Sequence, residues 1–338
     1  MQGDPRIIGC VPAGSGASVV HGALTRAIQG YGLTTYPPAW EYCPPLLWRL
    51  GQQPTDLVHA PPDHAVFACR RGTPLVVTFH NYVLDSAMRP FSSRAQCLHY
   101  ATDLRLFTRL ALRRAQVVTA VSAFTAALVR EDMRFRGAIE VIPNGVDTGR
   151  FSPAEREPTD GPLRVLFSGN LTRRKGADLL PEIARLAGPD VEIHYTTGAR
   201  AGIADPRWAG LRAIGRVPHA DMPALYRQFD VLLLPTVREG MSLALLEAMA
   251  SGLAVVASDA ASNPELIERA LGGLLCPVGE PEAYAAALRT LAADRERVRR
   301  MGQHNRRAVE CRYTLERMVE GYRAVFEQVL GRPVPLRG

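Results

Sequence analysis

One lysine stands alone among the cationic side chains of this sequence. Of the 40 lysine and arginine residues, 39 are arginine, and the exception, Lys175, lies in the segment 168–176. A compact ammonium grips a phosphate as a point charge, a task that differs from the bidentate pairing of a planar guanidinium. Lys175, with the neighbouring Arg173 and Arg174, is therefore a candidate phosphate-binding group. The alternative is chance, because one lysine has to fall somewhere.

Two glutamates, Glu239 and Glu247, follow the apolar run 231–234. Ser242 is a suitable N-cap for a helix between them, and the first amide groups of such a helix can bind an anion. The residues that start this helix are Gly240, Met241, Ser242 and Leu243. Glu247 is the only charge between 240 and 258, and its burial is costly unless a donor such as a sugar hydroxyl satisfies it. A helix-surface carboxylate is the alternative for either glutamate alone, but the pair favours a ligand site.

The N-terminal part carries two weaker signals. A turn after the apolar run 6–11 contains Gly14, Ser15 and Gly16, but it lacks the third glycine of the dinucleotide fingerprint. His80 follows another apolar run, a place where histidine is more often a capping than a catalytic residue. Neither signal predicts a site without further support.

The elements that must position these residues are short apolar runs separated by helical patterns. Such runs without polar alternation are typical of parallel strands covered by helices on both faces. The expected strands are 6–11, 56–60, 74–79, 116–121 and 139–142, then 163–168, 191–195, 211–214, 231–235 and 254–257. The sequence therefore predicts an α/β fold of two Rossmann-like doubly wound domains that face each other across a cleft. A polar stretch rich in proline and glycine separates the two sets of strands, so we expect domains at residues 1–155 and 156–310.

Composition and charge bound the protein class. Apolar residues make up 47% and charged residues 22%, which indicates a globular chain, and no apolar run approaches a membrane span. Six scattered cysteines and an N-terminus unlike a signal peptide favour free thiols in the cytoplasm. Nothing resembles a nucleic-acid module.

The net charge of +7 is concentrated in one region. Residues 89–136 contain nine arginines and three acidic residues, and 104–114 read as an amphipathic basic helix. Such a helix can lie on an anionic membrane surface or bind an acidic partner. A solvated helix in an arginine-rich protein is an equal alternative.

In their order and spacing, these motifs resemble the retaining glycosyltransferases of family 4, which have the GT-B fold. Glu239 and Glu247 match the E-x7-E signature, the segment 168–176 resembles the phosphate-gripping loop, and His80 matches the histidine beside the donor sugar. The resemblance covers essentially the whole chain. It implies that a final helix, at 311–332, crosses back onto the N-terminal domain.

The resemblance also implies roles for single residues. Arg173, Arg174, Lys175 and the amides of 240–243 would neutralise the leaving diphosphate. Glu247 would hold the ribose hydroxyls, and Glu239 would contact the donor sugar near its C3 hydroxyl. The backbone of Gly14, Ser15 and Gly16 would approach the diphosphate and the acceptor. Arg216 and Val217 belong to the loop whose backbone would contact the nucleotide base.

One departure from the family concerns Asn170, which stands where the family usually has arginine. Arg173 or Arg174 can substitute from the same loop, and the sequence leaves open which of them does.

The predicted function is a retaining transfer of a hexose from a UDP- or GDP-sugar to a hydroxyl acceptor, which can be lipid-linked or a polysaccharide precursor. The chain contains no DxD motif, so we do not expect a metal that bridges the diphosphate. We also expect no cofactor, with the nucleotide-diphosphate sugar as co-substrate. Two alternatives stay open: another GT-B chemistry, such as a phosphorylase or a nucleotide-sugar epimerase or hydrolase, and a noncatalytic nucleotide-sugar-binding protein. A pyridoxal-type phosphorylase would need a lysine of its own, and Lys175 is already committed. The sugar, base, acceptor, linkage and oligomeric state are not specified by the sequence.

Overall fold

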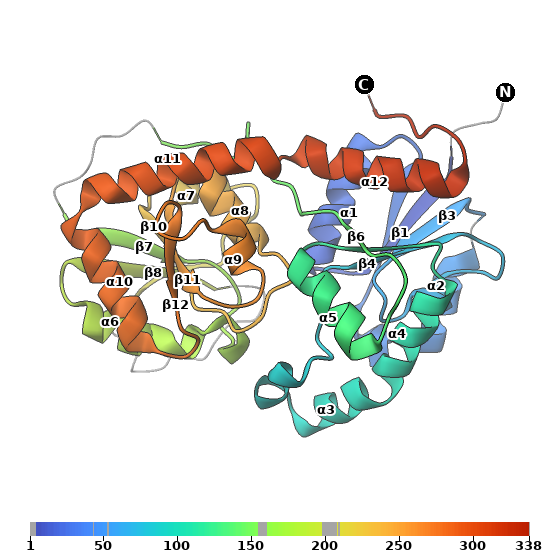
Figure 1. The fold of residues 1–338 in the computed structure, drawn as a ribbon, viewed down its shortest axis with the longest axis horizontal. Helices are drawn as coiled ribbons and strands as arrows, with labels where there is room; N and C mark the ends of the chain where they lie inside the picture. The colour runs from blue at the N-terminus through green and yellow to red at the C-terminus, as the bar shows by residue number, and fades with distance from the viewer. Residues whose placement is uncertain are drawn as a thin grey trace. The chain divides into compact units, whose positions relative to one another are not determined.

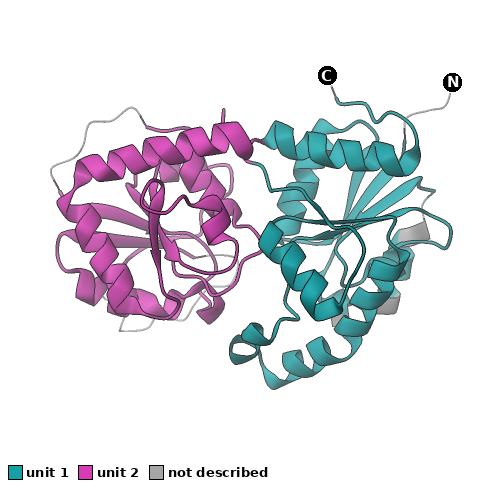
Figure 2. Ribbon diagram, viewed as in Figure 1, with its two compact units in different colours: residues 1–145, 315–338 teal, residues 146–314 magenta. Residues whose placement is uncertain are grey.

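The computed structural model describes residues 5–42, 44–52, 54–154, 161–197, 208 and 210–337. The chain divides into two compact units, one formed by 1–145 with 315–338 and the other by 146–314 (Figure 2). Cys43, one of the expected free thiols, lies outside the described residues, and the other five cysteines are free. The predicted domain boundary between 155 and 156 also lies outside them.

The chain passes from one unit to the other at 145/146 and 314/315, whereas the expected boundaries were 155/156 and 310/311. Residues 146–154 belong to the second unit because their backbone is bound there. The Val146 amide donates to the carbonyl oxygen of Tyr313 at 2.9 Å. The Arg306 guanidinium donates to the carbonyl oxygens of Thr148 at 3.0 Å and Phe151 at 2.6 Å. This segment therefore folds with the helix that carries Arg306, and not with the first unit.

The first unit contains a six-stranded sheet whose strands are all parallel, in the order β2-β1-β3-β4-β5-β6. The strands are β1 (Ile7–Pro12), β2 (Tyr31–Tyr36), β3 (Leu57–Ala60), β4 (Leu75–Phe79), β5 (Val117–Ala120) and β6 (Glu140–Val141). The main helices are α1 (Gly16–Ala27), α2 (Ala65–Ala68), α3 (Arg94–Ala101), α4 (Asp103–Arg114), α5 (Ala123–Met133) and α12 (Leu315–Leu330). Strand order reverses between β1 and β3.

Helices cover both faces of this sheet, as expected for buried parallel strands. On β4, Val76 packs with residues of α1 and α12, whereas Val77 packs with residues of α4 and α5 on the other face. Figure 1 shows α12, in red, beside α1, in blue, although they come from opposite ends of the chain. Tyr322 and Phe326 of α12 are fully buried in this layer.

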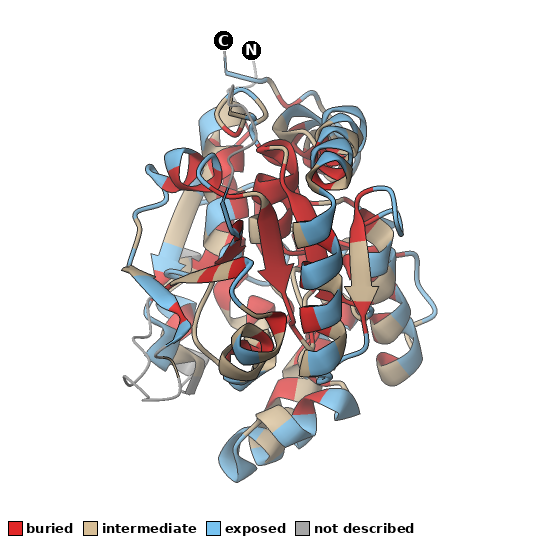
Figure 3. Ribbon diagram, turned by 90° about the vertical axis from the view of Figure 1, so that its left-hand side faces the viewer, coloured by how far each residue is buried: buried red, intermediate tan, exposed pale blue. Residues whose placement is uncertain are grey.

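The second unit also contains six parallel strands, in the order β12-β11-β10-β7-β8-β9. The strands are β7 (Leu163–Phe167), β8 (Val191–Thr196), β9 (Arg212–Gly215), β10 (Val231–Leu234), β11 (Ala254–Ser258) and β12 (Gly273–Cys276). The helices are α6 (Leu180–Ala187), α7 (Met222–Tyr226), α8 (Leu243–Ala250), α9 (Asn263–Leu266), α10 (Pro281–Ala293) and α11 (Arg295–Arg312). Every residue of β10 and β11 is buried, whereas the helices α10 and α11 have exposed outer faces (Figure 3). The predicted α/β class, two Rossmann-like doubly wound domains, is confirmed.

Candidate active site

The candidate site of the second unit lies where the strand order reverses. β7 pairs with β10, with Val165 opposite Val231 and Leu166 opposite Leu232. The chain turns away from β7 toward β8 and away from β10 toward β11, so the loops after β7 and β10 leave the carboxyl ends of neighbouring strands in opposite directions. Ligands of open α/β sheets bind at such switch points.

Lys175 and Glu239 meet at this point. Lys175 belongs to a short 3-10 helix, Arg173–Lys175, after β7, and Glu239 lies between β10 and α8. The Lys175 Nζ lies 2.6 Å from Glu239 Oε1, and the two side chains are only 15% and 13% exposed. Arg174 Nη1 lies 3.3 Å from the same oxygen, and the Thr236 hydroxyl donates to it at 3.3 Å. One carboxylate therefore holds two cations at the end of the sheet.

The charge of Glu239 is set by two opposing effects. Burial acts to raise the pKa of the carboxyl, but the charges of Lys175 and Arg174 and the hydrogen bonds from Lys175 and Thr236 outweigh it. The pKa of Glu239 is therefore below its ordinary value, and the carboxylate is ionised at neutral pH.

Backbone contacts bind the two loops together. The Val237 amide donates to the carbonyl oxygen of Arg174 at 2.9 Å, and Arg174 Nη1 donates to the carbonyl oxygen of Arg238 at 2.7 Å. Gly176 has φ = +73°, and a Cβ atom there would lie 2.1 Å from the carbonyl oxygen of Pro235. Glycine at 176 thus permits both the left-handed backbone and the close approach of the loops.

The structure separates the two arginines that the sequence left as alternatives. Arg174 is joined to Glu239, whereas Arg173 pairs with Asp178 at 3.7 Å and has a side chain that is 70% exposed. Arg174 is therefore the arginine of this loop that lies with Lys175.

The helix α8 begins beside this cluster. Ser242 is its N-cap, is buried, and accepts a hydrogen bond from the Leu245 amide at 3.3 Å. The amides at the start of a helix have no intrahelical acceptors, so those of Leu243 and Ala244 are available to an anion. Gly240 and Met241, which precede the cap, are buried.

Glu247 lies one turn further along α8 and is buried. Its Oε1 lies 3.0 Å from His219 Nε2, and its Oε2 accepts a hydrogen bond from the Tyr226 hydroxyl at 3.1 Å. His219 and Tyr226 therefore provide the hydrogen-bond donors for the Glu247 carboxylate that the sequence led us to expect from a ligand.

His219 was missed in the sequence, although it comes two residues after Val217. Arg216 and Val217 lie between β9 and His219, with Arg216 exposed and Val217 half-buried. The His219 side chain is 49% exposed, and its Nδ1 lies 3.4 Å from Arg150 Nη1. The sequence offered one signal for His219: it lies in the same loop as Arg216 and Val217, which were expected to contact the nucleotide base.

The other predicted site residues lie in the first unit. The turn Gly14–Gly16 joins β1 to α1, where Ser15 is the N-cap and accepts from the Ser18 amide at 3.1 Å. His80 follows β4, and its Nε2 lies 3.2 Å from His21 Nε2.

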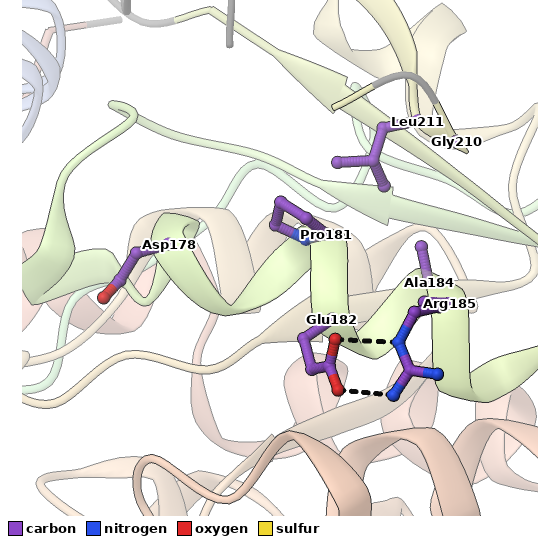
Figure 4. Close-up of a pocket in the computed structure, with 7 residues that line it drawn as sticks. All are labelled: Asp178, Pro181, Glu182, Ala184, Arg185, Gly210 and Leu211. Carbon is purple, nitrogen blue, oxygen red and sulfur yellow. Dashed lines mark hydrogen bonds and ion pairs between the residues drawn. The ribbon is translucent and has the colours of Figure 1, made fainter. Parts of the chain in front are cut away.

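A separate pocket of about 530 Å³ lies on the second unit beside α6 (Figure 4). Its described lining includes Pro181, Leu211 and the ion pair between Glu182 and Arg185, and it contains none of the predicted site residues. Across the described part of the chain, no group of three or more histidine, cysteine, aspartate or glutamate residues is arranged to hold a metal ion. Among the same residues, no helix is long and apolar enough to cross a membrane.

Comparison with known proteins places the chain in a family. Residues 7–150 match the family described as Glycosyltransferase Family 4, and residues 162–294 match Glycosyl transferases group 1. The lipopolysaccharide core biosynthesis mannosyltransferase LpcC of Rhizobium leguminosarum bv. viciae is 31% identical over 263 residues, which cover 71% of each chain. The chain belongs to the family 4 glycosyltransferases. The predicted resemblance and the predicted enzyme class are confirmed.

Other similar proteins are matched over different shares of their length. The amylovoran biosynthesis glycosyltransferase AmsK of Erwinia amylovora is 30% identical over 173 residues, and the match spans 42% of its length and 46% of this glycosyltransferase. Among solved structures, sucrose-phosphate synthase from Thermosynechococcus elongatus has a TM-score of 0.79 at 18% identity, with 96% and 99% of the two chains covered. Anabaena HepE in complex with UDP has a TM-score of 0.75 at 19% identity, with 96% and 100% covered. These structures identify the fold as GT-B.

Proposed function

We propose that this glycosyltransferase takes a hexose from a nucleotide-diphosphate sugar, a UDP- or GDP-sugar, and transfers it to a hydroxyl acceptor. The observation that carries the proposal is the cluster of Lys175, Arg174 and Glu239 beside the start of α8, at the switch point of a doubly wound sheet. Cations and unpaired helix amides at such a point suit a diphosphate. The UDP complex of HepE, a structure of the same fold, agrees with this donor class.

In the proposed mechanism, Lys175, Arg174 and the first amides of α8 accept the diphosphate as it leaves. Breaking the anomeric C–O bond places positive charge on the sugar ring and further negative charge on the diphosphate. Donors that are already in place stabilise this charge without reorganisation, which lowers the barrier. Glu239 keeps both cations in position and offers its second carboxylate oxygen to a sugar hydroxyl.

The proposal extends to stereochemistry and metal use. The leaving phosphate can accept the proton of the acceptor hydroxyl on the face that it leaves, so the configuration is retained without an enzymatic nucleophile. The arginine and lysine at 174 and 175 take the place of a metal ion that would bridge the diphosphate. We therefore propose a retaining, metal-independent reaction.

The pair of Glu247 and His219 is proposed to bind the ribose. The carboxylate is buried and held by Tyr226 from within, whereas His219 is half-exposed. A ribose hydroxyl can replace His219 as the donor to Oε1, or it can join the hydrogen bond, without leaving the buried charge unpaired.

The acceptor side is proposed to face an anionic membrane or a lipid-linked acceptor through α4. Leu106, Arg109, Leu110 and Arg113 are exposed and follow the i, i+3, i+4, i+7 spacing of one helix face. Leu106 is 53% and Leu110 39% exposed, and Leu98 of α3 is 66% exposed. Cationic and apolar side chains on one face suit an anionic lipid surface. Flotation should occur with anionic vesicles and not with neutral ones, and equal failure in both would contradict this part.

The donor proposal is tested with a panel of nucleotide sugars in the presence of a chelator. One of them should raise the melting temperature by mass action and support transfer of its sugar. In Lys175→Ala we expect kcat/KM to fall by about 100-fold or more, as when one preorganised donor is lost. Glu247→Ala should weaken binding of the nucleotide sugar.

Arg185→Ala is the matched control, because Arg185 pairs with Glu182 on the exposed surface of α6. Unchanged turnover in both site variants would remove the proposal. Release of free sugar without transfer would instead favour a hydrolase, and binding without turnover would favour a noncatalytic protein.

A further inference from the structure

A buried chain of hydrogen-bonded side chains runs inward from His80, and we name it the histidine relay. Its first link joins His80 Nε2 to His21 Nε2 at 3.2 Å. The Tyr31 hydroxyl then bridges His21 Nδ1 and His59 Nδ1, at 2.8 Å from each. His59 Nε2 lies 2.7 Å from the Thr78 hydroxyl, which lies 2.6 Å from the Thr119 hydroxyl.

The relay occupies the interior of the first unit. His21, His59, Thr78 and Thr119 have no exposed surface, and Tyr31 is 1% exposed. The rings of His21 and His59 stack with centroids 4.2 Å apart. Apolar side chains would fill this space without any demand for matched donors and acceptors, so a continuous polar chain here needs a reason.

Gly9 of β1 makes room for the central link. A Cβ atom at this position would lie 2.6 Å from both His21 Nδ1 and the Tyr31 hydroxyl oxygen. A side chain on this residue would therefore displace the hydrogen bond between His21 and Tyr31.

All three rings are neutral at physiological pH. Burial lowers the pKa of His80 to about 4. Burial lowers the pKa of His21 and of His59 well below the ordinary value, and the neighbouring imidazoles lower both further. Each ring therefore carries one proton, on either Nδ1 or Nε2.

The Tyr31 hydroxyl couples the rings because it has one proton and meets two Nδ1 atoms. If it donates to His21, then His21 carries its proton on Nε2 and donates to His80, and His59 donates to Tyr31 from Nδ1. If it donates to His59, then His21 carries its proton on Nδ1, and both His80 and His59 carry theirs on Nε2. In each case His59 and His80 have the same tautomer and His21 has the opposite one.

We propose that His21, held by Tyr31, is a positioning residue that fixes the ring orientation and tautomer of His80. The Nδ1 of His80 is buried and has no hydrogen-bond partner among the described residues, so it is the one ring nitrogen of the three histidines that no described group satisfies. The state of the relay decides whether His80 Nδ1 is a donor or an acceptor, and His59 Nδ1 is then in the same state. The part that concerns catalysis rests on the proposed function and on the family resemblance, which implies that His80 lies beside the donor sugar.

The relay itself is tested without any activity measurement. Long-range ¹H–¹⁵N correlation spectra of the full chain with ¹⁵N-labelled histidine report the tautomer of each ring. The relay signals are assigned from the spectra of His21→Gln, His59→Gln and His80→Gln, each of which lacks the signals of one ring. We expect neutral rings at pH 7, with His59 and His80 alike and His21 opposite. A charged ring, or His59 and His80 in different tautomers, would overturn the proposal.

Kinetics then test the positioning role. In His21→Leu we expect kcat to fall about tenfold, the effect of one hydrogen bond, with the KM for the nucleotide sugar within about twofold. His21→Gln places an amide near the position of Nε2 and should recover part of the loss. His64→Leu, at another buried histidine of the same unit, is the control for packing and should keep the parental kcat.

An equal loss in His21→Leu and His64→Leu, or no recovery in His21→Gln, would reduce His21 to a packing residue. If the tautomers obey the expected relation but the wild-type protein transfers no sugar, the proposed function fails and the relay stands. If transfer is normal and the tautomers do not obey it, the relay fails and the proposed function stands.

Discussion

At the scale of single residues, Glu239 decides the geometry of the site. Its carboxylate is largely buried and accepts from Lys175, Arg174 and Thr236, so two cations are held in place at the end of the sheet. Two cations beside one anion leave a net positive charge, which suits a diphosphate.

The first prediction separates Arg174 from Arg173. Replacing Arg174 by alanine removes a guanidinium joined to Glu239, and we expect kcat/KM for the nucleotide sugar to fall by about 100-fold. Arg173→Ala removes an exposed side chain whose ion pair with Asp178 spans 3.7 Å, so we expect a much smaller fall. Steady-state kinetics of the two variants check this order, and the reverse order would show that Arg173 reaches the phosphate.

The second prediction concerns the pH dependence of stability. The pKa of Glu239 is lower in the folded state than its ordinary value of 4.5. Its ionised form therefore contributes stability that is fully present above the unfolded pKa and is lost as the pH falls through the folded pKa. The free energy of unfolding of the wild type and of Glu239→Gln is measured with urea at pH 7 and at pH 3.5. The wild-type value minus the Glu239→Gln value should be larger at pH 7 than at pH 3.5. A difference independent of pH would contradict the folded-state charge pairing.

At the scale of elements, the loops after β7 and β10 act as one structure. Gly176 lies against Pro235, and the backbone of Arg174 accepts from Val237. The phosphate-binding loop thus depends on the loop that carries Glu239.

The third prediction compares two glycines with positive φ angles. Gly188, at the end of α6, has φ = +81° and ψ = −173°, a conformation almost restricted to glycine, and no atom lies within 4 Å of an added Cβ, so Gly188→Ala should cost about 1–3 kcal/mol from backbone strain alone. Gly176→Ala adds a clash with the Pro235 carbonyl, so we expect a larger loss of stability and a loss of nucleotide-sugar binding. Denaturant unfolding and thermal shift measure both. Equal behaviour of the two variants would mean that the loops can separate freely.

Strand prediction was most direct where the strands are buried on both faces, and it also found the exposed strands β6 and β9. The apolar runs that form β7, β10 and β11 contain no polar alternation, so the sequence identifies them directly. The edge strands β2 and β12 were not predicted. β2 contains glycine and two threonines, and β12 has two half-buried leucines between a glycine and a cysteine, so neither has the apolar signal of a central strand.

At the scale of the whole molecule, the first unit is completed by the end of the chain. Met318, Val319, Tyr322, Val325 and Phe326 of α12 are buried against residues of α1, β1, β3 and β4. At about 2 kcal/mol for each buried side chain, this layer contributes roughly 10 kcal/mol, comparable with the net stability of a domain.

The fourth prediction follows from this dependence. A chain that stops after Thr314 should lose the hydrogen-exchange protection of β1, β3 and β4, because their covering layer is gone. The strands β7, β10 and β11 should keep theirs, since the second unit ends at Thr314. Exchange measured by mass spectrometry on both chains checks the difference. Normal protection of β1 in the shortened chain would show that α12 is dispensable.

The sequence by itself determined the α/β class, the family and the candidate residues, because apolar runs and short motifs are local properties of a chain. Only the tertiary structure decided that β7 and β10 are neighbours, which brings Lys175 to Glu239, and that Arg174 rather than Arg173 joins them. It also revealed that the His219 ring contacts the Glu247 carboxylate and that a chain of hydrogen-bonded, buried side chains leads from His80 into the first unit. These contacts join residues far apart in the chain, and strand order and side-chain direction, which no local pattern encodes, bring them together.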